Sequence, residues 1–187
     1  DAWENGVGAD PPVVVYGEHA HYAVTRAIGQ LGLGLRKGIP IPSREYKIDV
    51  EAFRLVLDRL RDEEKQVMAV VASAGTTATG SFDDLETIGA LCEERDIWLH
   101  VDGAHGASAL LSARPPRALN GLRYSRSLAW DPHKMMLLPL AAGMVLTRNE
   151  TDLEHAFAQQ APYLFHAGKS ERVIDQGKRS FQCSRRA

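Results

Sequence analysis

The 187-residue sequence has the composition of a folded globular protein: 44% of its residues are hydrophobic and 25% are charged, which excludes disordered and fibrous classes. Its formal net charge is −2 with both signs interspersed, so we expect small molecules as partners rather than nucleic acid or an anionic membrane. The longest apolar run, residues 135–146, is broken by Pro139 and is shorter than the roughly 20 residues that a membrane-spanning helix needs.

The first third of the sequence predicts a strand followed by two helices. The short apolar run at residues 13–16 is typical of a buried strand. Apolar residues then recur with helical spacing over residues 20–31, and Gly32 follows as a stop signal. Asp49 is the predicted N-cap of the second helix, whose apolar residues fall on one face from residue 50 to residue 60.

The rest of the sequence continues the alternation of strands and helices. Residues 67–72 and 97–101 contain too little polarity for half-exposed strands, so we expect interior strands covered on both faces. Helical spacing over residues 83–95 connects these two strands. Further strands are predicted at residues 127–130 and 143–147, with a helix from residue 152 towards residue 160. The alternation predicts an α/β fold with a mostly parallel sheet, helices on both faces, and ligands beyond the carboxyl ends of the strands.

Chemically informative residues follow the predicted strand ends: Thr77, Asp102, His105, Asp131, His133 and Lys134. Lys134 stands between a short strand and an apolar run. Buried there, it would be a neutral amine able to condense with an aldehyde; the alternative is an ordinary surface lysine.

Asp102 and His21 are the other candidate site residues. A carboxylate at the end of an interior strand needs a partner, such as a protonated pyridine nitrogen, although an N-cap or a metal ligand remains an alternative for Asp102. His21 could stack on a cofactor ring or be a satisfied histidine at a helix start. With His19 it could suggest a metal site, but no third ligand has suitable spacing, and we expect no metal.

The two cysteines, Cys92 and Cys183, are far apart and outside any C-x-x-C pattern. This spacing is evidence against a zinc site or a disulfide framework, and we expect packed thiols in a reducing, cytoplasmic protein. The sequence opens at Asp1 without a methionine, and we expect a piece of a longer chain.

Four sequence blocks carry a resemblance to a known family. They are Ala-His-Tyr-Ala-Val at 20–24, Ala-Gly-Thr-Thr with Gly-Ser-Phe-Asp at 74–83, Trp-Leu-His-Val-Asp at 98–102, and Asp-Pro-His-Lys at 131–134. In this order and spacing they resemble the group II pyridoxal-phosphate-dependent decarboxylases, which act on glutamate, cysteine sulfinate, aspartate or aromatic amino acids. The resemblance runs nearly end to end and includes residues 161–165 and 182–186.

The resemblance implies the large domain of the pyridoxal-phosphate-dependent transferase fold (fold type I). Residues 1–187 would form its central part, without the upstream phosphate loop and the C-terminal small domain. The cofactor would be pyridoxal 5′-phosphate, and the implied roles follow by position. Lys134 would form the Schiff base, Asp102 would pair with the pyridine nitrogen, His21 and Ala104 would pack on the two ring faces, Thr77 would lie near the polar edge of the ring, and His133 would lie near the phosphate.

The resemblance also implies the reaction, which is the loss of carbon dioxide from an L-amino acid to give an amine. Tyr163 would return the proton, and Arg185 would hold a substrate carboxylate, which favours the acidic amino acids glutamate, aspartate and cysteine sulfinate. Alternatives are an aromatic substrate, another fold-type-I reaction such as transamination, and a non-catalytic cofactor-binding homologue. The family also implies a homodimer.

Two departures from the family pattern bear on the site. The sequence Gly103-Ala104-His105 stands where two alanines and an aromatic residue are common. Asp131 stands where asparagine is common, and a carboxylate would repel a phosphate unless it turns away or is bridged.

Overall fold

The computed structural model describes residues 2–157 and 179–180. The chain divides into two units, Asp1–Leu146 and Thr147–Ala187, and the first unit holds the sheet and nearly all of the described core. Helix α1 (Ala2–Asn5) precedes the sheet, and helix α5 (Asp152–Phe157) belongs to the second unit.

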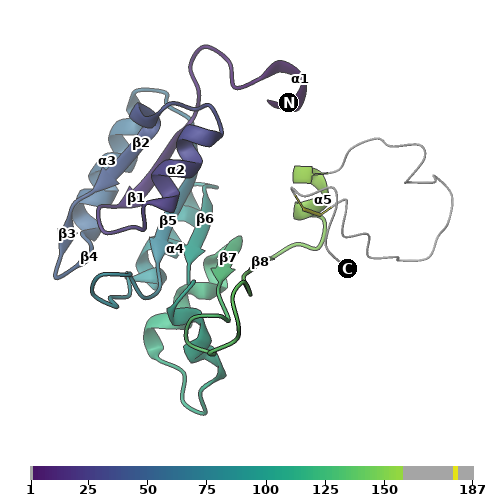
Figure 1. Cartoon of the computed structure of the whole chain (residues 1–187). Helices are drawn as coiled ribbons and strands as arrows, with labels where there is room; N and C mark the ends of the chain where they lie inside the picture. The colour runs from purple at the N-terminus through teal and green to yellow at the C-terminus, as the bar shows by residue number, and fades with distance from the viewer. Residues whose placement is uncertain (1, 158–178, 181–187) are drawn as a thin grey trace, which may run out of the picture. The chain divides into compact units, whose positions relative to one another are not determined.

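The first unit is built on a six-stranded sheet with the order β2-β1-β5-β6-β7-β8 (Figure 1). Its strands are β1 (Val13–Gly17), β2 (Gly38–Ile41), β5 (Val67–Ser73), β6 (Trp98–Asp102), β7 (Ser127–Trp130) and β8 (Met144–Thr147). The pairs β1–β2, β1–β5, β5–β6 and β6–β7 are all parallel. The predicted α/β fold with a mostly parallel sheet is confirmed.

Helices cover both faces of the sheet, and the alternating side chains of the strands separate two cores. Val15 of β1 points into the larger core, which includes Phe53 of α3 (Val50–Asp62) and Ile88 of α4 (Leu85–Glu94). Val14 points to the other face and packs with Ile28 of α2 (Ala23–Gln30). Burying each large apolar side chain contributes roughly 1.5–3 kcal/mol, so the face with α3 and α4 provides most of the hydrophobic stabilisation.

Side-chain caps begin two of the helices. Asp49 accepts hydrogen bonds from the backbone N–H groups of Glu51 (3.0 Å) and Ala52 (3.2 Å), which confirms the predicted N-cap of α3. These donors hold the pKa of Asp49 below its usual value. Asp84 caps α4 by accepting from the N–H of Thr87 at 3.1 Å.

Asp83 lies just before that cap and ties two separate strands together. Its side chain is 5% exposed; Oδ1 accepts from the N–H of Ile48 and Oδ2 from the N–H of Ser73, each at 2.7 Å. Ile48 belongs to a hairpin formed by β3 (Ser43–Arg44) and β4 (Lys47–Ile48), and Ser73 ends β5. One buried carboxylate therefore fastens the hairpin to the central sheet.

Coverage of the sheet differs from the expectation in one respect. β5 and β6 are interior strands by order, but α2 covers only part of one face: Val71 is buried there, whereas the rest of that face is open. On the side of α2, Met68 and Trp98 retain exposed surface and line a cavity. The expectation of full coverage was wrong because α2, with eight residues, is the only described helix packed on that face.

No helix in the described part of the chain is long and apolar enough to cross a membrane. Among the described residues, no group of three or more His, Cys, Asp or Glu side chains could hold a metal ion.

Candidate functional site

A cavity of about 670 Å³ opens on the α2 side of the sheet. Its wall is formed by α2, by the strands β1, β5, β6 and β7, and by the loops at their carboxyl ends. Six of the predicted site residues are described, and five of them line this cavity: His21, Thr77, Asp102, Ala104 and Lys134. The structure therefore brings together, from four separate segments, most of the site predicted from the sequence.

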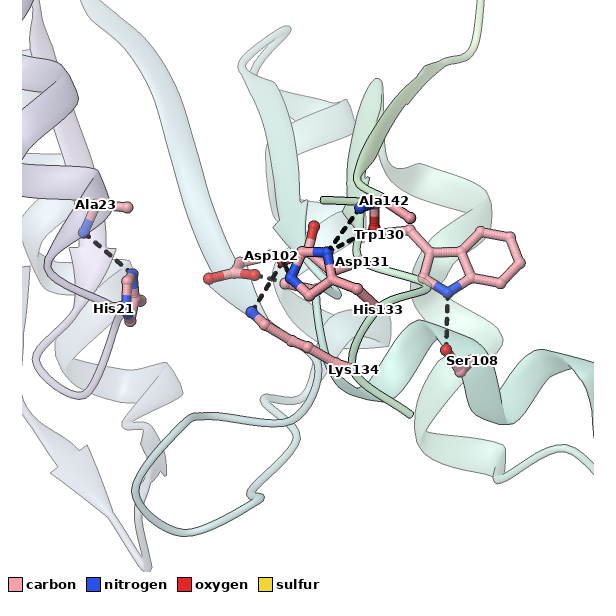
Figure 2. A network of polar contacts seen from close by, with 10 residues as sticks. His21, Ala23, Asp102, Ser108, Trp130, Asp131, His133, Lys134 and Ala142 are labelled. Carbon is pink, nitrogen blue, oxygen red and sulfur yellow. Dashed lines mark hydrogen bonds and ion pairs between the residues drawn. The ribbon is translucent and has the colours of Figure 1, made fainter. Parts of the chain in front are cut away.

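Lys134 follows β7 and makes an ion pair with Asp131, with 2.9 Å between Nζ and Oδ2 (Figure 2). Its side chain is 40% exposed, so of the two alternatives left open by the sequence the structure favours a partly exposed lysine over a buried one. The apolar residues that follow it, from Met135 to Leu140, are themselves exposed and do not cover it. The amine is accessible from the cavity and is held by a carboxylate three residues earlier.

Asp102 ends β6 and is half-buried in the cavity wall. Its Oδ1 accepts a hydrogen bond from the N–H of Ala104 at 3.2 Å, which turns the chain sharply after the strand. Parallel strands β6 and β7 end at the same edge of the sheet, so the carboxylate of Asp102 and the amine of Lys134 lie on one cavity wall.

His21 lies between β1 and α2, on a segment separate from Asp102 and Lys134 (Figure 2). The structure begins α2 at Ala23 rather than residue 20, which leaves His21 just before the helix. Its Nδ1 accepts from the N–H of Ala23 at 3.2 Å, and its ring lies 4.1 Å from the ring of Tyr22. The hydrogen bond agrees with the interpretation of His21 as a satisfied histidine at a helix start, and the residue also lines the cavity. Its stacking on a cofactor ring stays a prediction.

The loop after β5 places Thr77, which is exposed, at the cavity mouth. Gly75 has φ +92°, and a Cβ there would lie 3.0 Å from the backbone N of Gly106. Only glycine accommodates both that conformation and that close approach, which explains the small residue before the two threonines.

His133 is predicted to lie near a phosphate, but it is absent from the cavity wall. Its Nδ1 lies 2.7 Å from the carbonyl oxygen of Ala142 and 3.2 Å from the Ala142 nitrogen, and its Nε2 lies 3.8 Å from Oδ2 of Asp131. The ring is thus hydrogen-bonded to the backbone of the segment that leads into β8. The nearby Asp131 carboxylate faces Lys134, so its charge is balanced within the site.

Sequence reasoning missed three cavity residues: Trp98 and His100 on β6, and Ser127 on β7. Trp98 and His100 precede Asp102 by four and two residues, and alternate residues of a strand point to the same face. Counting back from Asp102 by this alternation places Trp98 and His100 on the cavity face of the strand. Ser127 follows only from the register, which places it opposite His100.

The predicted residues Tyr163 and Arg185 lie outside the described residues. Their roles stay predictions.

An accessible lysine amine and a strand-end carboxylate share a cavity at the carboxyl edge of a parallel sheet. Fold and site together define an α/β protein with a cavity at the carboxyl edge of its parallel sheet and a lysine amine on the cavity wall. The sequence model described as the pyridoxal-dependent decarboxylase conserved domain matches residues 3–187. The chain belongs to this pyridoxal-dependent decarboxylase family.

Individual relatives share about a third of its residues. Acidic amino acid decarboxylase GADL1 of Homo sapiens is 34% identical over the whole of this chain and 36% of that protein. Aromatic-L-amino-acid decarboxylase of Bacillus atrophaeus is 34% identical over 93% of this chain and 37% of that protein. The crystal structure of mouse CSAD matches with a TM-score of 0.89 and 31% identity, covering all of this chain and 39% of that one. The chain thus spans less than two fifths of the length of each.

Proposed function

We propose that the protein uses pyridoxal 5′-phosphate to decarboxylate an L-amino acid, releasing carbon dioxide and an amine. The observation that carries the proposal is the presence of the Lys134 amine and the Asp102 carboxylate on one cavity wall. The donor set fits this cofactor: an amine for its aldehyde, a carboxylate for its ring nitrogen, and an imidazole at His21 for its ring face. The accessible volume, about 670 Å³, is within the range of small-molecule sites.

Each residue has a task in this reaction. When bound, the cofactor supplies an aldehyde that condenses with amines and a cationic ring that accepts the electron pair left by departing carbon dioxide. Lys134 would hold the cofactor through its amine, and Asp131 would hold that amine in the cavity whenever it is free. Asp102 presents negative charge where the ring nitrogen would lie, which stabilises the charge that develops during the reaction.

His21, Ala104 and Thr77 would orient the cofactor ring from its two faces and its polar edge, with His133 near the phosphate. Tyr163 would return the proton to the substrate carbon as a general acid. The protein thus selects the bond that breaks by orientation and by placement of charge.

We place the substrate among the acidic amino acids, with Arg185 holding the second carboxylate. The human relative is named as an acidic amino acid decarboxylase, and the match to mouse CSAD supports the same branch. An aromatic substrate is the second candidate, since the Bacillus relative named for it has the same 34% identity. Carbon dioxide release measured across aspartate, glutamate, cysteine sulfinate and the aromatic amino acids would decide between them.

We further propose that the protein is a homodimer. The segment from Met135 to Leu140 directly follows Lys134 and exposes large apolar side chains, with Leu137 88% and Leu140 82% exposed. Contiguous exposed apolar surface of this kind is typical of protein interfaces. Replacing Leu137 with aspartate should shift the sedimentation of the protein from dimer to monomer; an unchanged sedimentation coefficient would contradict this interface.

We also propose that residues 1–187 form the central part of the cofactor-binding large domain; the match of the family model to residues 3–187 supports this. We place the protein in the cytoplasm, because Cys92 is a buried free thiol whose pKa burial raises to about 12, which is compatible with a reducing compartment. Microscopy of a tagged protein tests the location.

Borohydride trapping of the cofactor tests the central claim. The protein is incubated with pyridoxal phosphate, reduced and digested, and the modified peptide is identified by mass spectrometry. We expect the adduct on Lys134, and no adduct or carbon dioxide release in Lys134→Ala. Lys65→Ala is a matched control, because Lys65 is 39% exposed and also pairs with an aspartate, Asp10, at 2.9 Å. An adduct on another residue, or none, would overturn the proposal.

A further inference from the structure

A hydrogen-bonded relay of Trp98, Ser127 and His100 lies on the cavity wall and has no task in the proposed reaction. Oγ of Ser127 lies 2.8 Å from Nε1 of Trp98 and 2.8 Å from Nδ1 of His100. All three residues line the cavity together with Asp102. The relay spans β6 and β7, whose register pairs His100 with Ser127.

The donors and acceptors of the relay define the tautomer of His100. An indole nitrogen can only donate, so Ser127 accepts from Trp98. The buried hydroxyl of Ser127 then has its proton left to give, and Nδ1 of His100 is the acceptor within reach. This arrangement satisfies Nε1 of Trp98, Oγ of Ser127 and Nδ1 of His100, and it leaves the imidazole proton on Nε2.

The surroundings keep this imidazole neutral. Burial lowers the pKa of His100, and the negative charge of Asp102 only partly opposes that effect. A neutral ring with its proton on Nε2 is a hydrogen-bond donor without a positive charge. The other titratable groups on the cavity wall are His21, Asp102, His105, Asp131 and Lys134.

Asp102 is the carboxylate that β6 itself places next to His100 on the cavity face of the strand. The two residues are separated by one position on β6 and point to the same face, about 6.6 Å apart along the strand. An imidazole N–H and a carboxylate can span that separation directly or through one water molecule.

We propose that His100 is a positioning residue for Asp102: Trp98 and Ser127 fix its tautomer, and its Nε2–H orients the Asp102 carboxylate towards the ring nitrogen of the bound cofactor. The inference rests on the proposed function, and it extends that function from the Asp102 carboxylate to the residues that orient this carboxylate. Without this donor the Ala104 N–H alone would orient the carboxylate, and its hold on the ring nitrogen would weaken.

The test compares His100→Phe, which keeps a ring but removes the donor, with His100→Gln, whose amide can restore an N–H near the Nε2 position. The matched control is His19→Phe, because His19 also bonds a serine hydroxyl, Ser43 Oγ at 3.0 Å, but lies outside this cavity. Two readouts are used with the complete protein: the dissociation constant for pyridoxal phosphate, and the ¹⁵N chemical shift of the labelled ring nitrogen as a function of pH.

We expect His100→Phe to keep the borohydride adduct on Lys134 but to bind the cofactor about 10- to 100-fold more weakly, as for loss of one hydrogen bond to a charged group. The ring nitrogen should lose its proton at lower pH, and kcat should fall more than KM rises. His100→Gln should recover most of each effect, and His19→Phe should match the unmodified protein.

Ser127→Ala gives an independent measure, since it removes the relay and leaves the imidazole in place. It should move the ¹⁵N shift in the same direction as His100→Phe, by a smaller amount. Equal behaviour of His100→Phe and the unmodified protein, or no recovery in His100→Gln, would overturn the inference while the Lys134 adduct remains. If no adduct forms on Lys134 in the unmodified protein, the proposed function fails instead.

Discussion

Replacing Asp83 with asparagine should open the core around α4 without touching the cofactor cavity. Asp83 accepts two backbone hydrogen bonds of 2.7 Å, one from Ile48 and one from Ser73. An asparagine side chain has one acceptor oxygen, so it can accept only one of them, and its NH₂ group then faces the other backbone N–H. A buried donor without a partner costs about 1–3 kcal/mol.

Cys92 offers a reporter for this change, because it lies in the same core as Ile48 and is 1% exposed. Burial raises the pKa of its thiol to about 12, so the closed state should be unreactive. The labelling rate then follows the population of the open state, and 1–3 kcal/mol corresponds to about 5- to 150-fold faster labelling. The measurement is mass spectrometry of the peptide that contains Cys92 after timed exposure to iodoacetamide.

The pH dependence supplies a second check on Asp83. Burial raises its pKa above the usual 3.8, and the two backbone donors partly oppose this. The part of the stability that depends on protonation of Asp83 is therefore fully present below its unfolded pKa and is lost as pH rises through the folded one, while the two backbone hydrogen bonds of the ionised form offset part of this loss. Asp83→Asn should lack this decline, and Asp62→Asn, on the exposed surface, should label Cys92 at the original rate. Labelling unchanged in Asp83→Asn would refute the role of the carboxylate as a clamp.

Three other substitutions test helix packing and capping. Gly121→Ala should destabilise the protein by about 1–3 kcal/mol in urea unfolding, because the new Cβ would lie 2.1 Å from the backbone carbon of Leu85. Gly29→Ala is its counterpart: its Cβ meets only Leu35 Cδ2 at 3.5 Å, so stability should stay equal or rise by up to about 1 kcal/mol. Asp49→Ala should lower the unfolding midpoint at pH 7 and have little effect at pH 2. The pKa of Asp49 is lowered in the folded protein, so its contribution to stability is lost as pH falls. An equal effect at both pH values would contradict the capping role.

The main elements of the fold could be predicted because their apolar patterns are long or continuous. The strands β1, β5, β6 and β7 and the helices α3 and α4 lie within one or two residues of their predicted bounds. β2 was not predicted, since Gly38 and Pro40 interrupt its pattern; an edge position tolerates a proline because one side of the strand needs no donor. The β3–β4 hairpin was missed for a similar reason: Glu45 and Tyr46 adopt positive φ in its turn, where glycine or asparagine is the usual signal.

The candidate site was predictable only where strand ends or family motifs carry it. Asp102, Thr77 and Lys134 follow strand ends, and the parallel sheet brings them to one edge. The exposure of Lys134 could not be read from its apolar neighbours, because apolar composition does not reveal which residues another surface covers. Ser127 depended on the pairing register of two strands 25 residues or more apart, which a single sequence does not reveal.

Mutations on the two faces of β6 should have different consequences, one for the core and the other for the cavity. Leu99 and Val101 point into the larger core, whereas Trp98, His100 and Asp102 line the cavity. Natural variation on the cavity face can therefore retune chemistry while the fold is preserved, and variation on the core face is constrained whatever the substrate. Substitutions at the even-numbered positions of this strand should accordingly weaken cofactor binding or activity in a folded protein, and substitutions at the odd-numbered positions should lower stability.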